Sequence, residues 1–327
     1  MPLFEQLPVD RDAVAAAAKE HYGLVLGDRV KESQNTTFKA ANAEGVAYAV
    51  RATRDDEHGT KHRRVSDEMA FVDFFVQRGE DCVCAPLHPP VTRVQLPSLP
   101  AFTLCAIRWA DGEPVDFASM KWATDAATIR CWGATLARLH QGGREFELAH
   151  PDIAARMQRW DEVHCAIMAG VALHPDDAAA IDHPSAYGCI HGDLNLSNFH
   201  IVHGPDGPTA LRVFDWDQTQ RGWWEYDLAQ AAITTLMLTE GGALPTGDPV
   251  PGVSVEHFLE HLVAGYEAAG HGKVHMERLM RMLALRKLFY YKFCKQAAIE
   301  GNIPADMGWF IDYINRWMEK HPPSAAQ

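Results

Sequence analysis

The stretch Ile190-His191-Gly192-Asp193-Leu194-Asn195-Leu196-Ser197-Asn198 decides the interpretation of this chain, together with Val213-Phe214-Asp215-Trp216-Asp217 further on. The two segments offer one carboxylate, an amide at the end of the first stretch, and a second carboxylate after an apolar run. Phosphoryl transfer from ATP uses such a set. One Asp orients the accepting hydroxyl and takes its proton, while an Asn and another Asp hold Mg²⁺ on the nucleotide phosphates.

These motifs resemble the catalytic loop and the metal loop of the protein-kinase-like fold. The middle residue of His191-Gly192-Asp193 is Gly rather than Arg, and Asp215-Trp216-Asp217 stands in the place of Asp-Phe-Gly. Both features resemble the aminoglycoside phosphotransferase superfamily, which includes antibiotic kinases, choline and homoserine kinases, and a bacterial Ser/Thr kinase branch. The resemblance covers nearly the whole chain and is strongest between residues 190 and 229.

A hairpin is expected between the two motifs. Residues 198–203 and 210–214 read as short strands, and Gly204-Pro205-Asp206-Gly207-Pro208 between them is a turn signal. Such a hairpin would return Asp215 beside Asn198, as a shared metal ion requires. Asn198 and Asp215 are therefore the expected Mg²⁺ ligands. Asp217 would face the same way as Asp215 if the strand continued, so it is either a further metal ligand or a solvated acid.

The resemblance implies an α+β, two-lobe fold, with a nucleotide-binding lobe at 1–107 and a catalytic, acceptor-binding lobe at 108–327. In the first lobe, periodicity predicts helices at 12–22 and 66–77 and strands at 24–31, 36–41, 46–53, 82–87, 91–96 and 102–107. In the second, the predicted helices span 123–140, 152–169, 224–239, 255–269, 274–300 and 304–320. Residues 109–114 look like the hinge between the lobes.

Four features of the first lobe are candidates for nucleotide binding. Arg51 lies where the resemblance places a phosphate-binding Lys, and Glu68 on the following helix is its expected partner. No G-x-G-x-x-G is present, but the polar loop that contains Ser33 and Asn35 could offer backbone N–H and hydroxyl groups to phosphates. The base is expected against the hinge near Ile107 and Trp109.

Two residues are expected to support the catalytic Asp193. His191 is expected to brace the loop through hydrogen bonds. In the superfamily, an Asp comparable to Asp227 opens a core helix and accepts hydrogen bonds from the catalytic-loop backbone. An ordinary N-terminal helix acid is the alternative for Asp227.

The charge of the chain restricts the class of partner. Its net charge is −13 and no Lys/Arg-rich stripe is visible, which disfavours nucleic acid and anionic membranes. The negative field could attract a cationic substrate, although solubility alone also explains it. No apolar run reaches membrane-spanning length, and the start lacks a signal-peptide pattern, so a cytoplasmic location is expected.

The sequence therefore predicts a phosphotransferase that uses Mg²⁺ and ATP (or GTP). Its acceptor would be a hydroxyl on a small molecule: an aminoglycoside, an amino alcohol, a homoserine-like compound or a sugar. Two alternatives remain open, as does the oligomeric state. One is a protein Ser/Thr kinase of the same superfamily. The other is a catalytically silent nucleotide-binding regulator, which only the departure from Lys at Arg51 supports.

Overall fold

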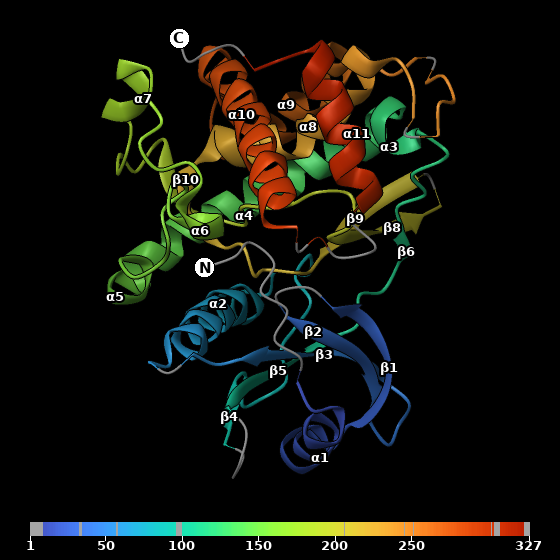
Figure 1. Ribbon diagram of the computed structural model, residues 1–327, viewed down its shortest axis with the longest axis vertical. Helices are drawn as coiled ribbons and strands as arrows, with labels where there is room; N and C mark the ends of the chain where they lie inside the picture. The colour runs from blue at the N-terminus through green and yellow to red at the C-terminus, as the bar shows by residue number, and fades with distance from the viewer. Residues whose placement is uncertain are drawn as a thin grey trace. The chain divides into compact units, whose positions relative to one another are not determined.

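The computed structural model describes residues 9–32, 35–56, 58–95, 100–205, 207–244, 246–250, 252–301, 303 and 308–323. The chain divides into two compact units, Met1–Ala110 and Asp111–Gln327 (Figure 1). The first is built mainly on a β-sheet and the second mainly on helices. The assignment of 1–107 and 108–327 as nucleotide and acceptor lobes stays a prediction.

The N-terminal unit is a five-stranded antiparallel sheet with two helices. The strand order is β1 (Val25–Glu32), β2 (Thr36–Ala41), β3 (Ala47–Arg54), β5 (Phe102–Arg108) and β4 (Thr92–Val94). Helix α1 (Arg11–Tyr22) begins at Asp10, whose carboxylate accepts hydrogen bonds from the backbone N–H groups of the first turn. It ends at Gly23, whose φ of 68° is readily adopted only by glycine.

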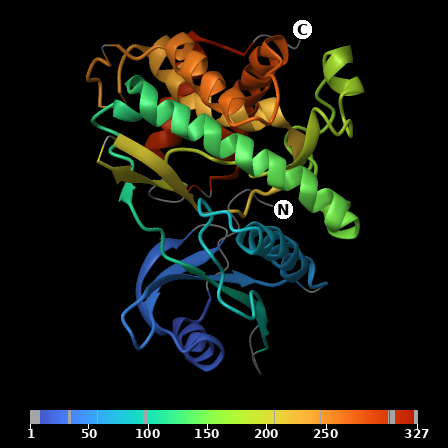
Figure 2. The same cartoon turned by 180° about the vertical axis from the view of Figure 1, so that it is seen from behind.

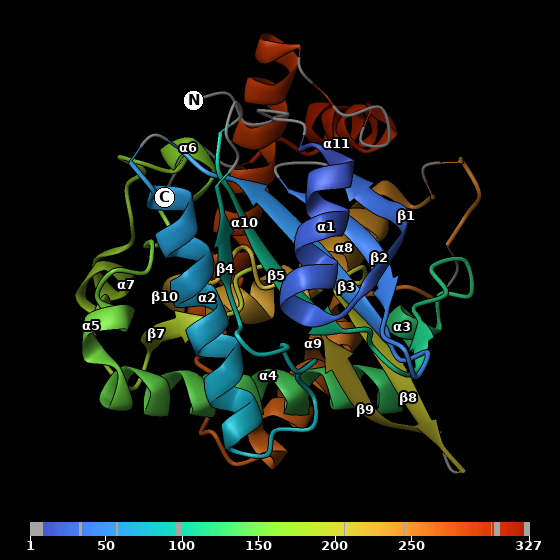
Figure 3. The same ribbon diagram turned by 90° about the horizontal axis from the view of Figure 1, so that it is seen from below.

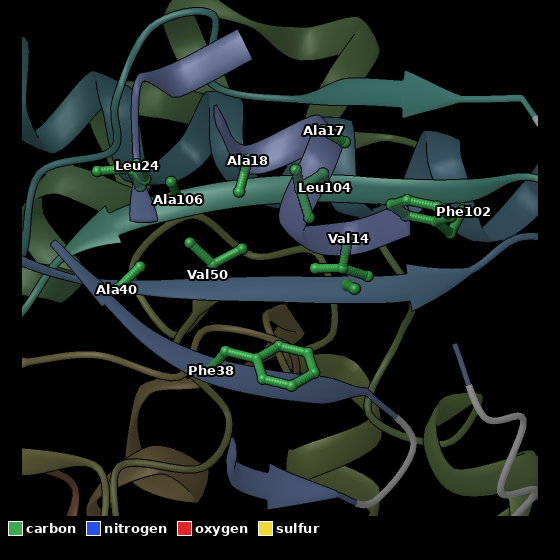
Figure 4. Close-up of a cluster of buried hydrophobic side chains, with 11 residues drawn as sticks. Val14, Ala17, Ala18, Leu24, Phe38, Ala40, Val50, Phe102, Leu104 and Ala106 are labelled. Atoms are coloured by element: carbon green, nitrogen blue, oxygen red, sulfur yellow. The ribbon is translucent and has the colours of Figure 1, made fainter. Parts of the chain in front are cut away.

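Side-chain alternation along β3 separates the core of this unit from its polar pair. Val50 points to the face covered by α1 and joins Val14, Phe38 and Leu104 in a buried apolar cluster (Figure 4). Because successive side chains of a strand point to opposite faces, Arg51 lies on the other face. Helix α2 (Thr60–Gln77) packs there (Figure 3).

The C-terminal unit is organised around a long helix, α4 (Ala126–Ala149), drawn in green in Figure 2. Its neighbour α9 (Val255–Ala268) approaches it closely because both helices carry a glycine at the crossing. A Cβ on Gly133 would lie 2.0 Å from the Leu262 carbonyl oxygen, and one on Gly265 would lie 2.1 Å from that of Arg130. No helix in the described parts of the chain is long and apolar enough to cross a membrane.

Helices α8 (Trp224–Gly241), α10 (Met276–Glu300) and α11 (Gly308–Lys320) complete the main helical layer. The short helices are α3 (Lys121–Thr124), α5 (Pro151–Ala154), α6 (Val163–Ala166) and α7 (Pro175–Ala179). Strand β7 (Tyr187–Ile190) pairs with β10 (Gln220–Trp223), and β6 (Glu113–Pro114), β8 (Phe199–Gly204) and β9 (Gly207–Val213) form a second small sheet. The predicted hairpin between the two motifs is therefore confirmed as β8 and β9.

Two predicted elements are wrong. The helix expected at 152–169 is replaced by α5, α6 and turns, because the backbone of this segment pairs with β10. Arg221 N–H donates to Gln158 O at 2.8 Å, and Trp160 N–H donates to Arg221 O at 2.9 Å. The strand expected at 82–87 makes only isolated bridges, one of them at Pro86, which has no N–H to donate to a ladder.

Candidate active site

The catalytic loop, residues 191–198, connects β7 to β8. The ends of the loop are fixed by pairing, since Ile190 lies opposite Gln220 and Phe199 lies opposite Val213. Phe214 N–H then donates to Asn198 O at 3.0 Å, one residue beyond the last pair of the hairpin. The hairpin thus brings the backbone next to Asp215 against Asn198.

Three side-chain amides hold the Asp193 carboxylate. Oδ1 accepts hydrogen bonds from Asn195 Nδ2 at 2.9 Å and from Gln230 Nε2 at 2.6 Å. Oδ2 lies 3.3 Å from Asn198 Nδ2, which also donates to the backbone oxygen of Asp193 at 2.8 Å. These donors come from the loop and from α8, so the carboxylate is oriented before any ligand arrives.

Burial raises the pKa of Asp193 to about 7. The hydrogen bond from Asn195 and the positive charge of Arg286 oppose this rise, whereas the negative charges of Asp217 and Asp215 add to it. A carboxylic acid with a pKa near the working pH is well suited to accept and release a proton. The influence of two further acids also shows that negative charge gathers around Asp193.

Asp215 has a left-handed backbone, with φ of 62°. Strand β9 ends at Val213, so the chain turns before Asp215 instead of continuing as a strand. Asp217 was expected to face the same way as Asp215 only if the strand continued, and this condition is not met because β9 ends at Val213. The role of Asp217 at the metal site stays a prediction. Left-handed non-glycine residues are strained and are common at functional sites.

The oxygen donors around the loop fit a hard divalent cation. The amide nitrogen of Asn198 is turned to Asp193, so its Oδ1, which accepts a hydrogen bond from Ser197 Oγ at 3.2 Å, still has a second lone pair. Among the described residues, no group of three or more His, Cys, Asp or Glu side chains is placed to bind a metal ion without other ligands. Mg²⁺ in nucleotide sites typically takes one or two carboxylates plus substrate phosphates, so Asn198 and Asp215 suit it.

His191 links the catalytic loop to the segment that carries Asp215. Its Nδ1 accepts the backbone N–H of Asp193 at 3.3 Å, and its Nε2 lies 3.2 Å from the carbonyl oxygen of Phe214. A carbonyl only accepts, so Nε2 carries the proton of a neutral ring. Burial lowers the pKa of His191 and outweighs the opposing charge of Asp227, which keeps the ring neutral.

Asp227, in the first turn of α8, is fully buried beneath the loop. Its Oδ1 accepts the N–H of Gly192 at 3.0 Å, and its Oδ2 accepts the N–H of His191 at 3.2 Å. His140 Nε2 lies 3.2 Å from Oδ2. Burial favours the protonated form, but the hydrogen bond and charge of His140 outweigh burial and lower the pKa of Asp227.

Two residues that the sequence prediction left out of the site, Gln230 and Arg286, make contacts to the loop. Gln230 lies one helical turn after Asp227 and donates to both Asp193 and the Tyr290 hydroxyl, the latter at 3.0 Å. Arg286 Nη2 donates to Gly192 O at 2.7 Å. Asp227 and Gln230 are three residues apart, so they lie on the same face of the helix. This spacing could have been used to predict that Gln230 also contacts the loop.

The N-terminal unit contains the expected ion pair. Arg51 Nη2 lies 2.6 Å from Glu68 Oε2, and both side chains are buried. Strand β3 and helix α2 carry these residues, in the order that the resemblance implies. The contact orients the guanidinium, and its role toward a nucleotide stays a prediction.

The other nucleotide-site candidates are placed as follows. Asn35 Oδ1 accepts a hydrogen bond from Thr53 Oγ1 at 2.7 Å, which ties the β1–β2 loop to the strand of Arg51. Ser33 lies outside the described residues. Ile107 is near the end of β5 opposite Ala49, and Trp109 N–H donates to Ala47 O at 3.0 Å. Lys39 Nζ lies over the Trp109 ring, 4.9 Å from its centroid.

Comparison with known proteins supplies the family context. A family model described as the phosphotransferase enzyme family (APH) matches residues 31–276. No curated protein matches the sequence significantly. Among solved structures, an amicoumacin kinase in complex with AMP-PNP and Ca²⁺ is similar, with a TM-score of 0.70, 18% identity, and coverage of 98% of this chain and 96% of that chain.

Two further structures share the fold. A microcompartment-associated aminopropanol kinase has a TM-score of 0.57 at 18% identity, covering 94% of this chain and 95% of that chain. A macrolide 2′-phosphotransferase from Brachybacterium faecium has a TM-score of 0.52 at 16% identity, covering 96% and 99%. These likenesses confirm the predicted protein-kinase-like fold class.

Proposed function

This chain belongs to the phosphotransferase enzyme family, and from that premise we propose which of its residues carry out the transfer. It is an ATP-dependent kinase that acts on hydroxyl groups of small molecules. We propose that Asp193 is the catalytic base. The observation that carries this role is the position of its carboxylate, which amides from Asn195 and Gln230 hold with a pKa of about 7.

We propose that the phosphoryl group is transferred in a single displacement at the γ-phosphorus. The oxygen of the acceptor hydroxyl forms a bond to the γ-phosphorus of ATP, and the bond from that phosphorus to the β-phosphate oxygen breaks. The hydroxyl proton passes to Asp193, and ADP leaves. Because the transition state of phosphoryl transfer is loose, orientation of the hydroxyl is the larger part of the contribution of Asp193.

Asn198 and Asp215 would hold a divalent cation, and Mg²⁺ is the ion that we propose. When bound, the cation neutralises charge on the nucleotide phosphates. Asp217 is proposed to support this site through its charge. The amicoumacin kinase structure contains Ca²⁺ and AMP-PNP, which supports use of a divalent cation with a nucleotide in this fold.

In the N-terminal unit, Arg51 is proposed to contact the nucleotide phosphates, with Glu68 holding its guanidinium in place. A guanidinium can bind phosphate with two parallel hydrogen bonds, which a Lys cannot do. Backbone groups of the loop that contains Asn35 and Ser33 are proposed to assist. The segment from Ile107 to Trp109 is proposed to lie against the base.

The acceptor is proposed to be a small, positively charged alcohol. Asp215 and Asp217 place negative charge near Asp193, which the positive charge of Arg286 opposes only in part, and the chain carries a net charge of −13. Both would attract a cation. The aminopropanol kinase among the similar structures supports an amino alcohol as the first class to test.

A protein substrate is less favoured by the structure. Strand β10 begins at Gln220 and runs directly into α8 at Trp224, so only a short segment follows Asp217. Protein kinases use a longer activation segment to form the groove for a peptide. The shortness of this segment supports a small acceptor.

The decisive experiment compares wild type with Asp193→Asn in phosphate transfer from Mg²⁺-ATP to a panel of amino alcohols and aminoglycosides. The expected loss of turnover is about 10³-fold, within the usual contribution of a positioned base. Nucleotide affinity, measured by calorimetry, should change by less than about twofold. Normal turnover in the variant would disprove the role of Asp193. Nucleotide binding by wild type without transfer to any acceptor would instead favour a silent regulator.

A further inference from the structure

The Tyr290 hydroxyl on α10 is linked to the catalytic carboxylate by one side chain. Gln230 Nε2 donates a hydrogen bond to Asp193 Oδ1 at 2.6 Å and another to the Tyr290 oxygen at 3.0 Å. The sum of these two lengths, 5.6 Å, is the upper limit for the distance between the two oxygens. Gln230 is buried, whereas Asp193 and Tyr290 are both partly exposed. A small ligand at Asp193 can therefore reach Tyr290 as well.

The direction of these hydrogen bonds follows from the charge of Asp193. Before phosphoryl transfer the base is an ionised carboxylate, which only accepts hydrogen bonds. An amide oxygen in the place of Gln230 Nε2 would face this carboxylate with no hydrogen between them, so the amide must present its nitrogen. Both N–H bonds of that nitrogen are then used, one toward Asp193 and one toward Tyr290. The Tyr290 oxygen is thus an acceptor, and its own O–H must donate elsewhere.

The Tyr290 O–H is an unused donor at a fixed position. Within the described ranges, the bond from Gln230 is the only hydrogen bond of this hydroxyl. Burial and the negative charge of Asp193 raise the pKa of Tyr290, so the hydroxyl keeps its proton. Edge-to-face contacts with Phe289 and Phe310, at centroid distances of 5.5 and 6.0 Å, hold the ring in place. The proton is therefore available to a ligand.

The two oxygens of the Asp193 carboxylate are not equivalent. Oδ1 accepts hydrogen bonds from Asn195 Nδ2 and Gln230 Nε2. Oδ2 has one contact among the described side chains, at 3.3 Å from Asn198 Nδ2, which is longer than the usual N–H···O distance of about 2.9 Å. Oδ2 is therefore the oxygen with room for the hydroxyl of an acceptor.

We propose that Tyr290 selects the acceptor by donating a hydrogen bond to an oxygen next to the reacting hydroxyl. The acceptor is then a vicinal diol, with one oxygen at Asp193 Oδ2 and the neighbouring oxygen at the Tyr290 hydroxyl. Hydrogen bonds of about 2.8 Å at both ends, together with the diol between them, are long enough to span this gap. The inference rests on the proposed function, since it requires Asp193 to be the base.

The hydrogen-bonding chemistry of Tyr290 restricts where an acceptor can carry a positive charge. An ammonium group has no lone pair, so it cannot accept the Tyr290 O–H in place of the second oxygen. A cationic acceptor must hence carry its amino group beyond the diol, as an aminodiol or an amino sugar does. A simple amino alcohol with one hydroxyl leaves the Tyr290 donor unpaired and is the poorer substrate.

The test compares three acceptors in phosphate transfer from Mg²⁺-ATP. One is an aminopropanediol with hydroxyls on neighbouring carbons, and the others are the two aminopropanols that each lack one of those hydroxyls. In wild type, kcat/KM for the diol should exceed that for either aminopropanol by at least about tenfold, as one hydrogen bond provides. The preference should appear mainly in KM, because this hydrogen bond is present both before and during transfer.

Matched variants assign the preference to one hydroxyl. Tyr290→Phe, which removes only the oxygen, should bring the ratio of kcat/KM for diol and aminopropanol to within about twofold of one. A merely structural role would lower kcat/KM for all three acceptors equally and leave this ratio unchanged. Tyr291→Phe removes the same group from the next residue of α10, whose ring contacts Lys295, and should keep the preference of wild type.

The outcomes separate this inference from the proposed function. Transfer by wild type without a diol preference, or with a preference that Tyr290→Phe retains, would overturn the role of Tyr290 and leave the proposed function intact. If only an aminoglycoside is phosphorylated, the pair becomes that acceptor and its analogue without the hydroxyl next to the phosphorylated one. Absence of transfer to any of these acceptors would overturn the proposed function, and the role of Tyr290 with it.

Discussion

The catalytic loop contains a partly buried carboxylate and the first turn of α8 a fully buried one, and the two environments shift the carboxylate pKa in opposite directions. Asp193 in the loop has a pKa raised to about 7, chiefly by burial. Asp227 is more deeply buried, yet its pKa is lowered. The difference lies in the donors. Asp227 accepts two backbone N–H groups and has the His140 ring as a partner, whereas Asp193 is held by neutral side-chain amides and faces other acids.

The two carboxylates thus differ in role: one stabilises the fold and the other is suited to accept a proton. A charge that is fully compensated stabilises the fold, and Asp227 uses its charge to fix the loop backbone. A charge that is only partly compensated costs stability but remains reactive, as the proposed role of Asp193 requires. Trade-offs between stability and function of this kind are common at active sites.

The largest expected effect is on stability, in Asp227→Asn. An Asn can accept hydrogen bonds at only one of its two terminal atoms, so its NH₂ group would face the N–H of either His191 or Gly192. A buried donor left without an acceptor costs about 1–3 kcal/mol. Urea denaturation should show this loss relative to wild type. The exposed Glu260→Gln, which removes the same charge, should change stability by less than about 0.5 kcal/mol.

The stability that is lost in Asp227→Asn should depend on pH. Because the folded pKa of Asp227 is lowered, its stabilisation is present above the unfolded Asp pKa of about 3.9 and is lost as pH falls through the folded value. The difference between wild type and Asp227→Asn should therefore shrink in acid. A constant difference from pH 7 down to pH 3 would mean that the charge of Asp227 does not stabilise the fold.

The second effect is on catalysis. If Asp193 acts as a carboxylate base, kcat/KM should fall about tenfold for each pH unit below its pKa and level off above it. A bound cation lowers this pKa from the value of about 7 in the metal-free site. The measurement is kcat/KM at saturating Mg²⁺ for an acceptor that does not itself titrate between pH 5 and 9. A flat profile over that range would show that Asp193 orients the hydroxyl without titrating.

The smallest expected effect is a gain in stability of about 1 kcal/mol in Asp193→Asn at pH 8, without nucleotide or Mg²⁺. The folded state binds more protons at Asp193 than the unfolded state between pH 4 and pH 7, so wild-type stability falls as pH rises across this window. The gain should consequently disappear at pH 4. Destabilisation at pH 8 would show that the hydrogen bonds of the carboxylate outweigh its burial.

Local patterns predicted the parts of the fold that depend on neighbouring residues. The turn signal at 204–208 and the apolar runs around it predicted the β8–β9 hairpin, and the order of strand and helix predicted the pairing of Arg51 with Glu68. Prediction was wrong at 152–169, where an amphipathic pattern suggested a helix. Pairing of Gln158 and Trp160 with Arg221 decided that segment, and such long-range hydrogen bonds are not visible in local periodicity.

The phosphotransferase class of this protein could be predicted from local sequence, because Asp193, Asn198 and Asp215, the proposed base and metal ligands, lie within one short hairpin unit. The environment of those residues could not be predicted from local sequence. Gln230 and Arg286 reach the loop from helices distant in sequence, and Tyr290 holds Gln230 in place. Burial and the donors that converge on a carboxylate set its pKa, and both depend on packing between distant segments.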